Sequence, residues 1–260
     1  RIDERFAKVK ADGRKALITF LTVGDPNMEV SEKAIYTMQE EGVDLIELGV
    51  PFSDPAADGP VIQRADERAL AQGVDIFKVF ELVRKIRNNV EVPMVFLLYY
   101  NVMVQYGIEK FFKRCQETGV DGLIIPDLPY EESDEIKEYT EKYGVYQISL
   151  VSPTSKDRIK NIAKDAKGFL YCISSLGVTG EKSSFVTNFD EFVGTIKKYT
   201  DVPACVGFGV SNGKQVKELT KYFDGAIVGS AIVKSIATGE SVEERINNLR
   251  EKIKDLKSGL

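Results

Sequence analysis

The chain has 260 residues, of which 43% are hydrophobic and 29% are charged. This composition excludes a disordered or fibrous protein, and the length suits one large domain or two small ones. With 35 basic and 40 acidic residues, the net charge of −5 gives no general attraction to nucleic acid or anionic membranes. The absence of histidine excludes a Ser-His-Asp hydrolase, a histidine general base and a histidine-ligated zinc site.

The cysteines and the first apolar stretch indicate a compartment. Cys115, Cys172 and Cys205 are three in number and far apart, so they form neither an even disulfide set nor a C-x-x-C pair. We expect three buried free thiols in a reducing environment. The apolar stretch 16–23 is far shorter than the roughly 20 residues that cross a bilayer. The sequence therefore predicts a cytoplasmic protein.

Short runs rich in Val and Ile alternate with segments of helical period, which is typical of repeated βα units on a parallel sheet. In chain order, the eight predicted strands are Ala16–Thr22, Leu45–Leu48, Met94–Tyr99, Gly122–Ile125, Tyr146–Val151, Phe169–Ile173, Ala204–Gly207 and Gly225–Val228. Apolar residues at steps of three and four predict helices between them, for example over 76–86 and 159–166. A last amphipathic helix over 242–256 is expected on the exterior.

Glycines mark the ends of several predicted helices. After two of them the next strand opens with the same residues, Gly42-Val43-Asp44 and Gly119-Val120-Asp121, and Phe223-Asp224-Gly225 is a looser version. We interpret these repeats as structural punctuation, because glycine suits the left-handed conformation that ends a helix.

Eight βα units in about 250 residues predict an α/β fold, a TIM (β/α)8 barrel, as a single domain over residues 1–260. No linker or charge block divides the chain. The competing fold, a doubly wound open sheet, requires a glycine-rich dinucleotide loop after an early strand, and the sequence has none there.

Carboxylates at the end of the second predicted strand are candidates for chemistry. Glu47 stands alone in an apolar strand, where desolvation raises its pKa and suits it to shuttle protons near neutral pH. A structural glutamate paired with a buried lysine or hydroxyl is an equally open interpretation. In the proline-rich loop that follows, Asp54 and Asp58 are turn or N-cap residues, or one of them is a second functional carboxylate.

Small residues follow each of the last three predicted strands, at 177–180, 207–209 and 229–231. Because these loops of a TIM barrel often bind phosphate through backbone N–H groups, the pattern predicts a phosphorylated substrate, with Ser230 as a further donor. Tyr171, Asp127 and Asn101 also lie near strand ends. A core aromatic and two loop caps are the alternative interpretations of these three.

Several motifs together resemble the tryptophan synthase alpha chain family. The longest runs from Glu47 to Pro60 (ELGVPFSDPAADGP), with Ile62-Gln63 following. The others, in the family's order, are Gly24-Asp25-Pro26, Tyr100-Asn101, Pro126-Asp127-Leu128-Pro129 with Glu131-Glu132, Ser152-Pro153-Thr154, Gly177-Val178-Thr179-Gly180, Gly207-Phe208-Gly209 and Val228-Gly229-Ser230-Ala231. The resemblance therefore covers nearly the whole chain.

The resemblance implies a lyase of L-tryptophan biosynthesis that cleaves indole-3-glycerol phosphate to indole and glyceraldehyde 3-phosphate. It implies a tryptophan synthase beta chain as partner, in an α2β2 heterotetramer, to which indole is passed. Pyridoxal phosphate is expected in the beta partner, with no cofactor or metal in this chain.

The resemblance also assigns residues. Glu47 is the acid and base, Asp58 faces the indole nitrogen, and Tyr171 joins them in the catalytic site. Phe20, Leu98 and Tyr100 are expected to wall the indole pocket. The residues expected at the substrate phosphate are Gly180, Phe208, Gly209, Gly229 and Ser230, with Thr179 on a loop over the site. One departure is Lys182, where many family members have an arginine.

The reaction that the resemblance implies is one that two carboxylates can catalyse. A retro-aldol cleavage requires protonation of indole C3, polarisation of the ring N–H and deprotonation of a side-chain hydroxyl, which a carboxyl of raised pKa and an ionised partner can supply. The alternatives are a stand-alone indole-releasing lyase and a subunit that chiefly activates the beta chain. Another phosphosugar barrel, an isomerase or decarboxylase, would share the rim glycines but not the Glu47 and Asp58 motif.

Overall fold

The computed structural model describes residues 1–173, 188–207 and 209–260. In these residues a parallel sheet has the strand order β5-β4-β3-β2-β1-β9-β8-β7-β6. Its strands are β1 (Ala16–Thr22), β2 (Leu45–Gly49), β3 (Met94–Leu97), β4 (Gly122–Ile124), β5 (Tyr146–Gln147), β6 (Ser149–Val151), β7 (Leu170–Ile173), β8 (Ala204–Gly207) and β9 (Gly225–Val228).

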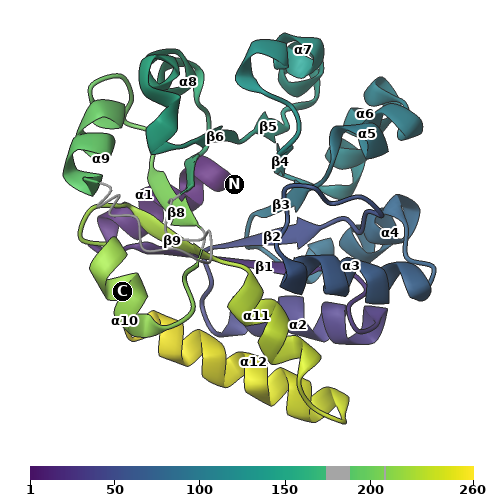
Figure 1. Ribbon diagram of the computed structural model, residues 1–260. Coiled ribbons are helices and arrows are strands. Elements are labelled where there is room, and N and C mark those ends of the chain that lie inside the picture. The colour runs from purple at the N-terminus through teal and green to yellow at the C-terminus, as the bar shows by residue number, and fades with distance from the viewer. Residues whose placement is uncertain (174–187, 208) are drawn as a thin grey trace.

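The sheet closes on itself through β5 and β6. These two strands are consecutive pieces of one extended segment, with only Ile148 between them. Because β5 pairs with β4 and β6 pairs with β7, the two ends of the strand order are joined by the chain. The result is the predicted TIM barrel with eight strand positions, surrounded by helices (Figure 1).

The described α-helices are α1 (Ile2–Ala11), α2 (Met28–Glu40), α3 (Pro60–Ala71), α4 (Ile76–Ile86), α5 (Tyr100–Tyr106), α6 (Ile108–Thr118), α7 (Asp134–Tyr143), α8 (Ile159–Asp165), α9 (Phe189–Lys197), α10 (Gly213–Leu219), α11 (Ser230–Ala237) and α12 (Val242–Lys257). Short 3-10 helices are η1 (Arg87–Asn89), η2 (Tyr130–Glu132) and η3 (Pro153–Arg158). Side-chain oxygens of Asn27, Asp75, Asn212 and Ser241 accept N–H groups three residues on and so cap α2, α4, α10 and α12.

The predicted strands agree with the observed ones to within two residues, apart from the break at Ile148. The largest difference at a strand end is in β3, which was predicted to reach Tyr99 but ends at Leu97, because the chain turns there into α5. Val95 and Leu97, which share the inner face, both lie within the observed strand.

Helix α1 closes the N-terminal end of the barrel. Its buried side chains Ile2, Phe6 and Val9 join the cluster of strand residues that fills the interior. The rings of Phe6 and Phe169 lie 5.7 Å apart between centroids. Since apolar side chains fill this end, the space for a substrate lies at the opposite end, where the strands run into their longer loops.

The repeated aspartates of the sequence form the same kind of contacts at three strand starts. Asp44, Asp121 and Asp224 each accept the N–H of a residue on the preceding strand in the chain, at 2.9 Å in all three cases. Each also pairs with a cation, for example Arg14 with both oxygens of Asp44 at 2.7 Å. The interpretation of these repeats as structural is consistent with this position at the N-terminal end of the barrel.

Among the described residues, no helix is both long and apolar enough to span a membrane.

Candidate active site

Glu47 lies in the middle of β2 and faces the inside of the barrel. It pairs in register with Phe20 on one side and Val95 on the other, and Val95 belongs to the interior cluster. The residue is only 1% exposed. Its Oε1 has no hydrogen-bond partner among the described residues. Burial raises the pKa of Glu47 to about 8, so the side chain carries a proton at neutral pH.

Asp58 lies half-buried in the loop between β2 and α3, directly before the Gly59 that caps α3. Its Oδ2 accepts a hydrogen bond from the Tyr99 hydroxyl at 2.7 Å. The same hydroxyl accepts the N–H of Ala57 at 2.9 Å, and the Tyr99 ring stacks on Phe52 with 5.0 Å between centroids. Burial raises the pKa of Asp58, while the Tyr99 hydrogen bond lowers it. Tyr99 therefore holds Asp58 in place and favours its ionised form.

Tyr171, in β7, lies 9% exposed on the interior side of the barrel wall. A Cβ on Gly207 would lie 2.6 Å from the Tyr171 hydroxyl, so the ring lies directly over the end of β8. Burial raises the pKa of Tyr171, and the charges of Glu47 and Asp58 raise it further. Glu47 and Asp58 therefore both lie within electrostatic reach of the Tyr171 hydroxyl.

An apolar wall adjoins the carboxylates. Phe20, at the end of β1, packs with Ile62 and Val233, which come from α3 and α11. A Cβ on Gly49 would lie 2.5 Å from the Phe20 ring, so only glycine at 49 leaves the ring where it lies. Phe20 thus presents an apolar ring beside Glu47, with which it pairs in register.

Two of the expected wall residues, Leu98 and Tyr100, have described contacts outside the interior cluster. Leu98 is fully buried in the layer between sheet and helices, and the Tyr100 hydroxyl donates to Glu135 on α7 at 2.6 Å. Their neighbours Leu97 and Tyr99 face the site. Side chains alternate along a strand, and Val95 and Leu97 share the inner face. Leu97 and Tyr99 are therefore further candidates for the wall, beside Leu98 and Tyr100.

The expected phosphate loops are described in part. Gly229 precedes α11, and Ser230 opens this helix with its side chain exposed. Gly209 has φ +76°, a conformation that favours glycine. Thr179, Gly180 and Phe208 lie outside the described residues, as does Lys182. The described part therefore offers a helix start and a glycine turn after adjacent strands β8 and β9.

Asp66 is a buried carboxylate that the sequence reasoning missed. It lies on the inner face of α3 with Ile62, Ala65 and Ala69, and it is 5% exposed. Burial and the charge of Asp58 raise the pKa of Asp66 to about 8. A signal was present, because Asp66 falls on the apolar stripe of an otherwise amphipathic helix.

The other polar candidates, Asp54, Asp127 and Asn101, are exposed. Asp54 is exposed and accepts a hydrogen bond from the Ser53 hydroxyl, and Asp127 caps α5 by accepting the Tyr100 N–H at 2.9 Å. Asn101 is exposed on α5. Among the described residues, no group of three or more His, Cys, Asp or Glu side chains is arranged to hold a metal ion.

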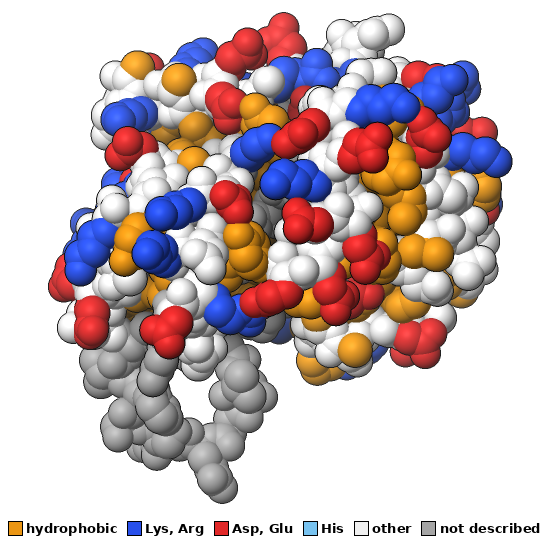
Figure 2. All heavy atoms as spheres, turned by 90° about the horizontal axis from the view of Figure 1, so that it is seen from above, with side chains coloured by type: hydrophobic (Ala, Val, Ile, Leu, Met, Phe, Trp, Pro, Cys, Tyr) orange, Lys and Arg blue, Asp and Glu red, His pale blue; other side chains and the backbone are white. Residues whose placement is uncertain are grey.

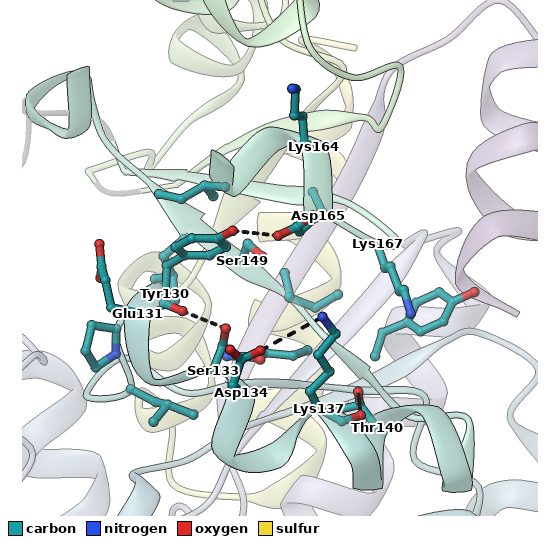
Figure 3. A pocket seen from close by; sticks show the side chains of 18 of the residues that line it. Tyr130, Glu131, Ser133, Asp134, Lys137, Thr140, Ser149, Lys164, Asp165 and Lys167 are labelled. Carbon is teal, nitrogen blue, oxygen red and sulfur yellow. Dashed lines mark hydrogen bonds and ion pairs between the residues drawn. The ribbon is translucent and has the colours of Figure 1, made fainter. Parts of the chain in front are cut away.

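A cavity of about 990 Å³ lies outside the barrel, between α7 and α8. Tyr130 spans it by donating to Asp165 at 2.5 Å, as Figure 3 shows. Lys137 and Asp134 form an ion pair at 3.9 Å along its edge. The face over this cavity carries acidic and basic side chains intermixed (Figure 2). It contains neither Glu47 nor Asp58, so it is separate from the candidate active site.

Comparison with known proteins follows this geometry. The model of the family described as "Tryptophan synthase alpha chain" matches residues 6–260. A tryptophan synthase alpha chain of Thermoanaerobacter sp. (strain X514) is 47% identical over 260 residues, which cover 100% of this chain and 99% of that protein. One from Methanocaldococcus jannaschii is 47% identical over 238 residues, covering 91% and 84% of the two chains.

Solved structures agree. A structure from Aquifex aeolicus VF5 superposes with a TM-score of 0.90 at 38% identity, over 100% of this chain and 98% of that chain. A tryptophan synthase structure from M. tuberculosis gives a TM-score of 0.88 at 33% identity, with the same coverage.

Proposed function

The chain belongs to the tryptophan synthase alpha chain family, and we propose that Glu47 and Asp58 are its catalytic carboxylates. It is a lyase of tryptophan biosynthesis that cleaves indole-3-glycerol phosphate to indole and glyceraldehyde 3-phosphate. The observation that carries the residue assignment is Glu47, a buried carboxyl with an unpartnered oxygen on the inner face of β2.

Glu47 both gives and takes the proton. With a pKa of about 8, it is an acid at neutral pH and protonates C3 of the indole ring. The carboxylate that remains then accepts the proton of the adjacent side-chain hydroxyl. The bond between C3 and the carbon that carries this hydroxyl breaks, and its electron pair moves into the ring. That carbon becomes the aldehyde carbon of glyceraldehyde 3-phosphate, which leaves. Glu47 ends in the protonation state in which it began.

Asp58 stabilises the ring nitrogen while C3 is protonated. The positive charge of the protonated ring is shared with the nitrogen, whose N–H donates to an ionised carboxylate. The Tyr99 hydroxyl, 2.7 Å from Oδ2, keeps Asp58 oriented and favours its anion, which is the form that this role requires.

The remaining residues bind substrate. Phe20, Leu98 and Tyr100, with Leu97 and Tyr99 as further candidates, wall the indole ring, and Tyr171 lies against the reacting region. The phosphate is held by backbone N–H groups near Gly209 and Gly229 and by the Ser230 hydroxyl, together with Thr179, Gly180 and Phe208. Support for this comes from the start of α11 beside the glycine turn after β8.

Membership of the family implies a beta-chain partner. We assign pyridoxal phosphate to that partner, because the retro-aldol step needs only proton transfers in this chain. The α2β2 stoichiometry that the resemblance implies is part of the same proposal. The loop of Asp54 is our candidate contact. It borders a shallow cavity of about 390 Å³ that Phe52, Pro55 and Leu70 also line. The cytoplasmic location belongs to the same proposal and is supported by three buried free thiols.

Substitution of Glu47 tests the catalytic assignment. We expect Glu47→Gln to lower indole release from indole-3-glycerol phosphate by about 10³-fold, in the range for loss of a general acid-base group. The amide keeps the size of the side chain but cannot carry the proton. The measurement is indole formation by the purified variant, with circular dichroism to verify its fold.

The matched control is Glu138→Gln, which changes an exposed glutamate on α7. This variant should release indole at the parent rate. If Glu47→Gln kept at least a third of the parent rate while folded, Glu47 would not be the proton carrier.

A further inference from the structure

Asp66 lies on the inner face of α3, close to the site but outside the mechanism above. Helix α3 packs its inner face against Phe20 at the end of β1 through Ile62 and Ala65. Asp66 follows Ala65 and is 5% exposed. The side chain of Thr22, the last residue of β1, is also buried, at 1% exposure. A carboxyl is thus enclosed between a helix and the strand end beside the indole wall.

The described hydrogen bonding of Asp66 would stabilise a carboxylate anion only weakly. Its described hydrogen bond comes from the Thr22 hydroxyl at 3.4 Å. The guanidinium of Arg68, two residues along α3, instead donates to both oxygens of Asp25 at 2.7 and 2.9 Å. Among the described residues no cation pairs with Asp66. A carboxylate buried without a cation is strongly disfavoured relative to its neutral acid.

Asp58 is more exposed than Asp66 and accepts a shorter hydrogen bond. It is half-buried, and it accepts a 2.7 Å hydrogen bond from Tyr99. Its charge raises the pKa of Asp66, and both carboxylates raise the pKa of Tyr99. Two carboxylates that share a poorly solvated region do not both ionise readily. The better hydrogen bond therefore decides which of the two holds the charge.

We propose that Asp66, enclosed between α3 and the end of β1 with no cation paired to it among the described residues, keeps its proton at physiological pH, so that Asp58 alone is the charged carboxylate on the indole side of the site. The Thr22 contact and the closed α3 interface hold the acid in place. The role of Asp58 in this statement rests on the proposed function, whereas the neutral state of Asp66 does not.

Thermal unfolding across pH tests the proton on Asp66 without any substrate. A group that keeps its proton in the folded chain but loses it when unfolded lowers stability progressively as pH rises between its two pKa values. Asp66→Asn cannot titrate. Its unfolding midpoint should therefore rise relative to the full-length parent by about 5 °C or more between pH 5 and pH 8, and then level off.

The control is Glu67→Gln, the exposed neighbour on the same helix, whose midpoint should follow the parent at every pH. Asp66→Ser serves as a second neutral variant if the asparagine does not fold. A difference between Asp66→Asn and the parent that stays constant with pH would overturn the proposal, because a purely structural change has no such pH dependence.

Indole release at pH 7 provides the second readout. Since Asp66 is neutral there, Asp66→Asn should keep kcat/KM within about twofold of the parent. A tenfold loss in a folded variant would overturn the proposal, because an amide is as neutral as the acid that the proposal places there. If the parent itself released no indole, the proposed function would fail, while the thermal measurement would still decide whether Asp66 holds a proton.

Discussion

At the scale of single residues, the partner of a buried carboxylate decides its charge. Asp25 is 3% exposed and meets Arg68 through two short hydrogen bonds. Glu47 and Asp66 are buried to a similar degree, but neither pairs with a cation among the described residues, and the pKa of each is raised to about 8. A buried carboxyl without a cation beside it therefore holds its proton more tightly than an exposed one.

The acid form of Glu47 sets an expected pH dependence. Below its pKa of about 8 Glu47 holds the proton that C3 requires, and above it the acid form is lost. We expect kcat/KM to fall about tenfold per pH unit on the alkaline side of pH 8, measured up to about pH 10.

The pH profile is best taken in Asp66→Asn as well, where the second carboxyl that titrates near pH 8 is absent. A profile that stayed level past pH 9 in both proteins would remove Glu47 as the proton donor.

At the scale of elements, the end of one strand decides the composition of the pocket wall. Strand β3 stops at Leu97, and Tyr100 already belongs to α5. Leu97 keeps the inward direction of Val95, while Leu98 faces the outer layer. Tyr99, between strand and helix, reaches Asp58. Alternation from Val95 therefore makes Leu97 and Tyr99 candidates for the wall beside Leu98 and Tyr100, which the family resemblance implied.

Strand starts depend on the repeated aspartates. Asp121 accepts the Met94 N–H at 2.9 Å and pairs with Arg1 at 2.7 Å and Arg87 at 3.3 Å. We expect Asp121→Ala to lower the free energy of unfolding by about 3 kcal/mol, because it leaves a buried donor and a largely buried arginine with fewer partners. Thermal or denaturant unfolding measures the change.

The control, Asp134→Asn, changes a carboxylate that is 87% exposed and should shift stability by less than about 0.5 kcal/mol. Equal stability of the two variants would show that the Asp121 contacts contribute little to the barrel.

At the scale of the whole molecule, the barrel brings together residues that are far apart in the chain. Glu47 and Asp58 come from β2 and its loop, Tyr171 from β7, and Ser230 from the start of α11. In the strand order β9 follows β1 and β8 follows β9, so the first and last strands are neighbours and the elements that carry these residues adjoin. The N-terminal end, filled by α1 and the repeated aspartates, supports this arrangement without taking part in it.

Assembly with a beta chain is expected to change the activity of the whole site. We expect indole release to rise about tenfold or more when a tryptophan synthase beta chain is added, which is a typical size for coupling between sites. Because this chain has no tryptophan, indole fluorescence follows the reaction without a tryptophan background from it.

A heat-denatured beta chain is the control. Equal turnover with and without the partner would indicate a stand-alone lyase. An isolated chain that is inert but still stimulates the beta chain would indicate an activating subunit.

The sequence by itself determined the class of fold, because alternation of apolar runs and helical periods is local and repeats eight times. It also determined that Glu47 would be desolvated, since a lone carboxyl within an apolar strand of a parallel sheet is surrounded by apolar side chains rather than water. The motif from Glu47 to Pro60 indicated the family, and the family match over residues 6–260 confirmed it.

Only the tertiary structure decided which side chains complete the site. That Tyr99 bonds to Asp58 and that Asp66 is buried without a cation depend on how β3, the loop before α3 and the end of β1 meet in space. Local patterns contain no information about such contacts, because the direction of a side chain at a strand end is set by where the chain turns. The charge of a carboxyl is likewise set by partners that are distant in sequence, as Asp58 and Tyr99 are.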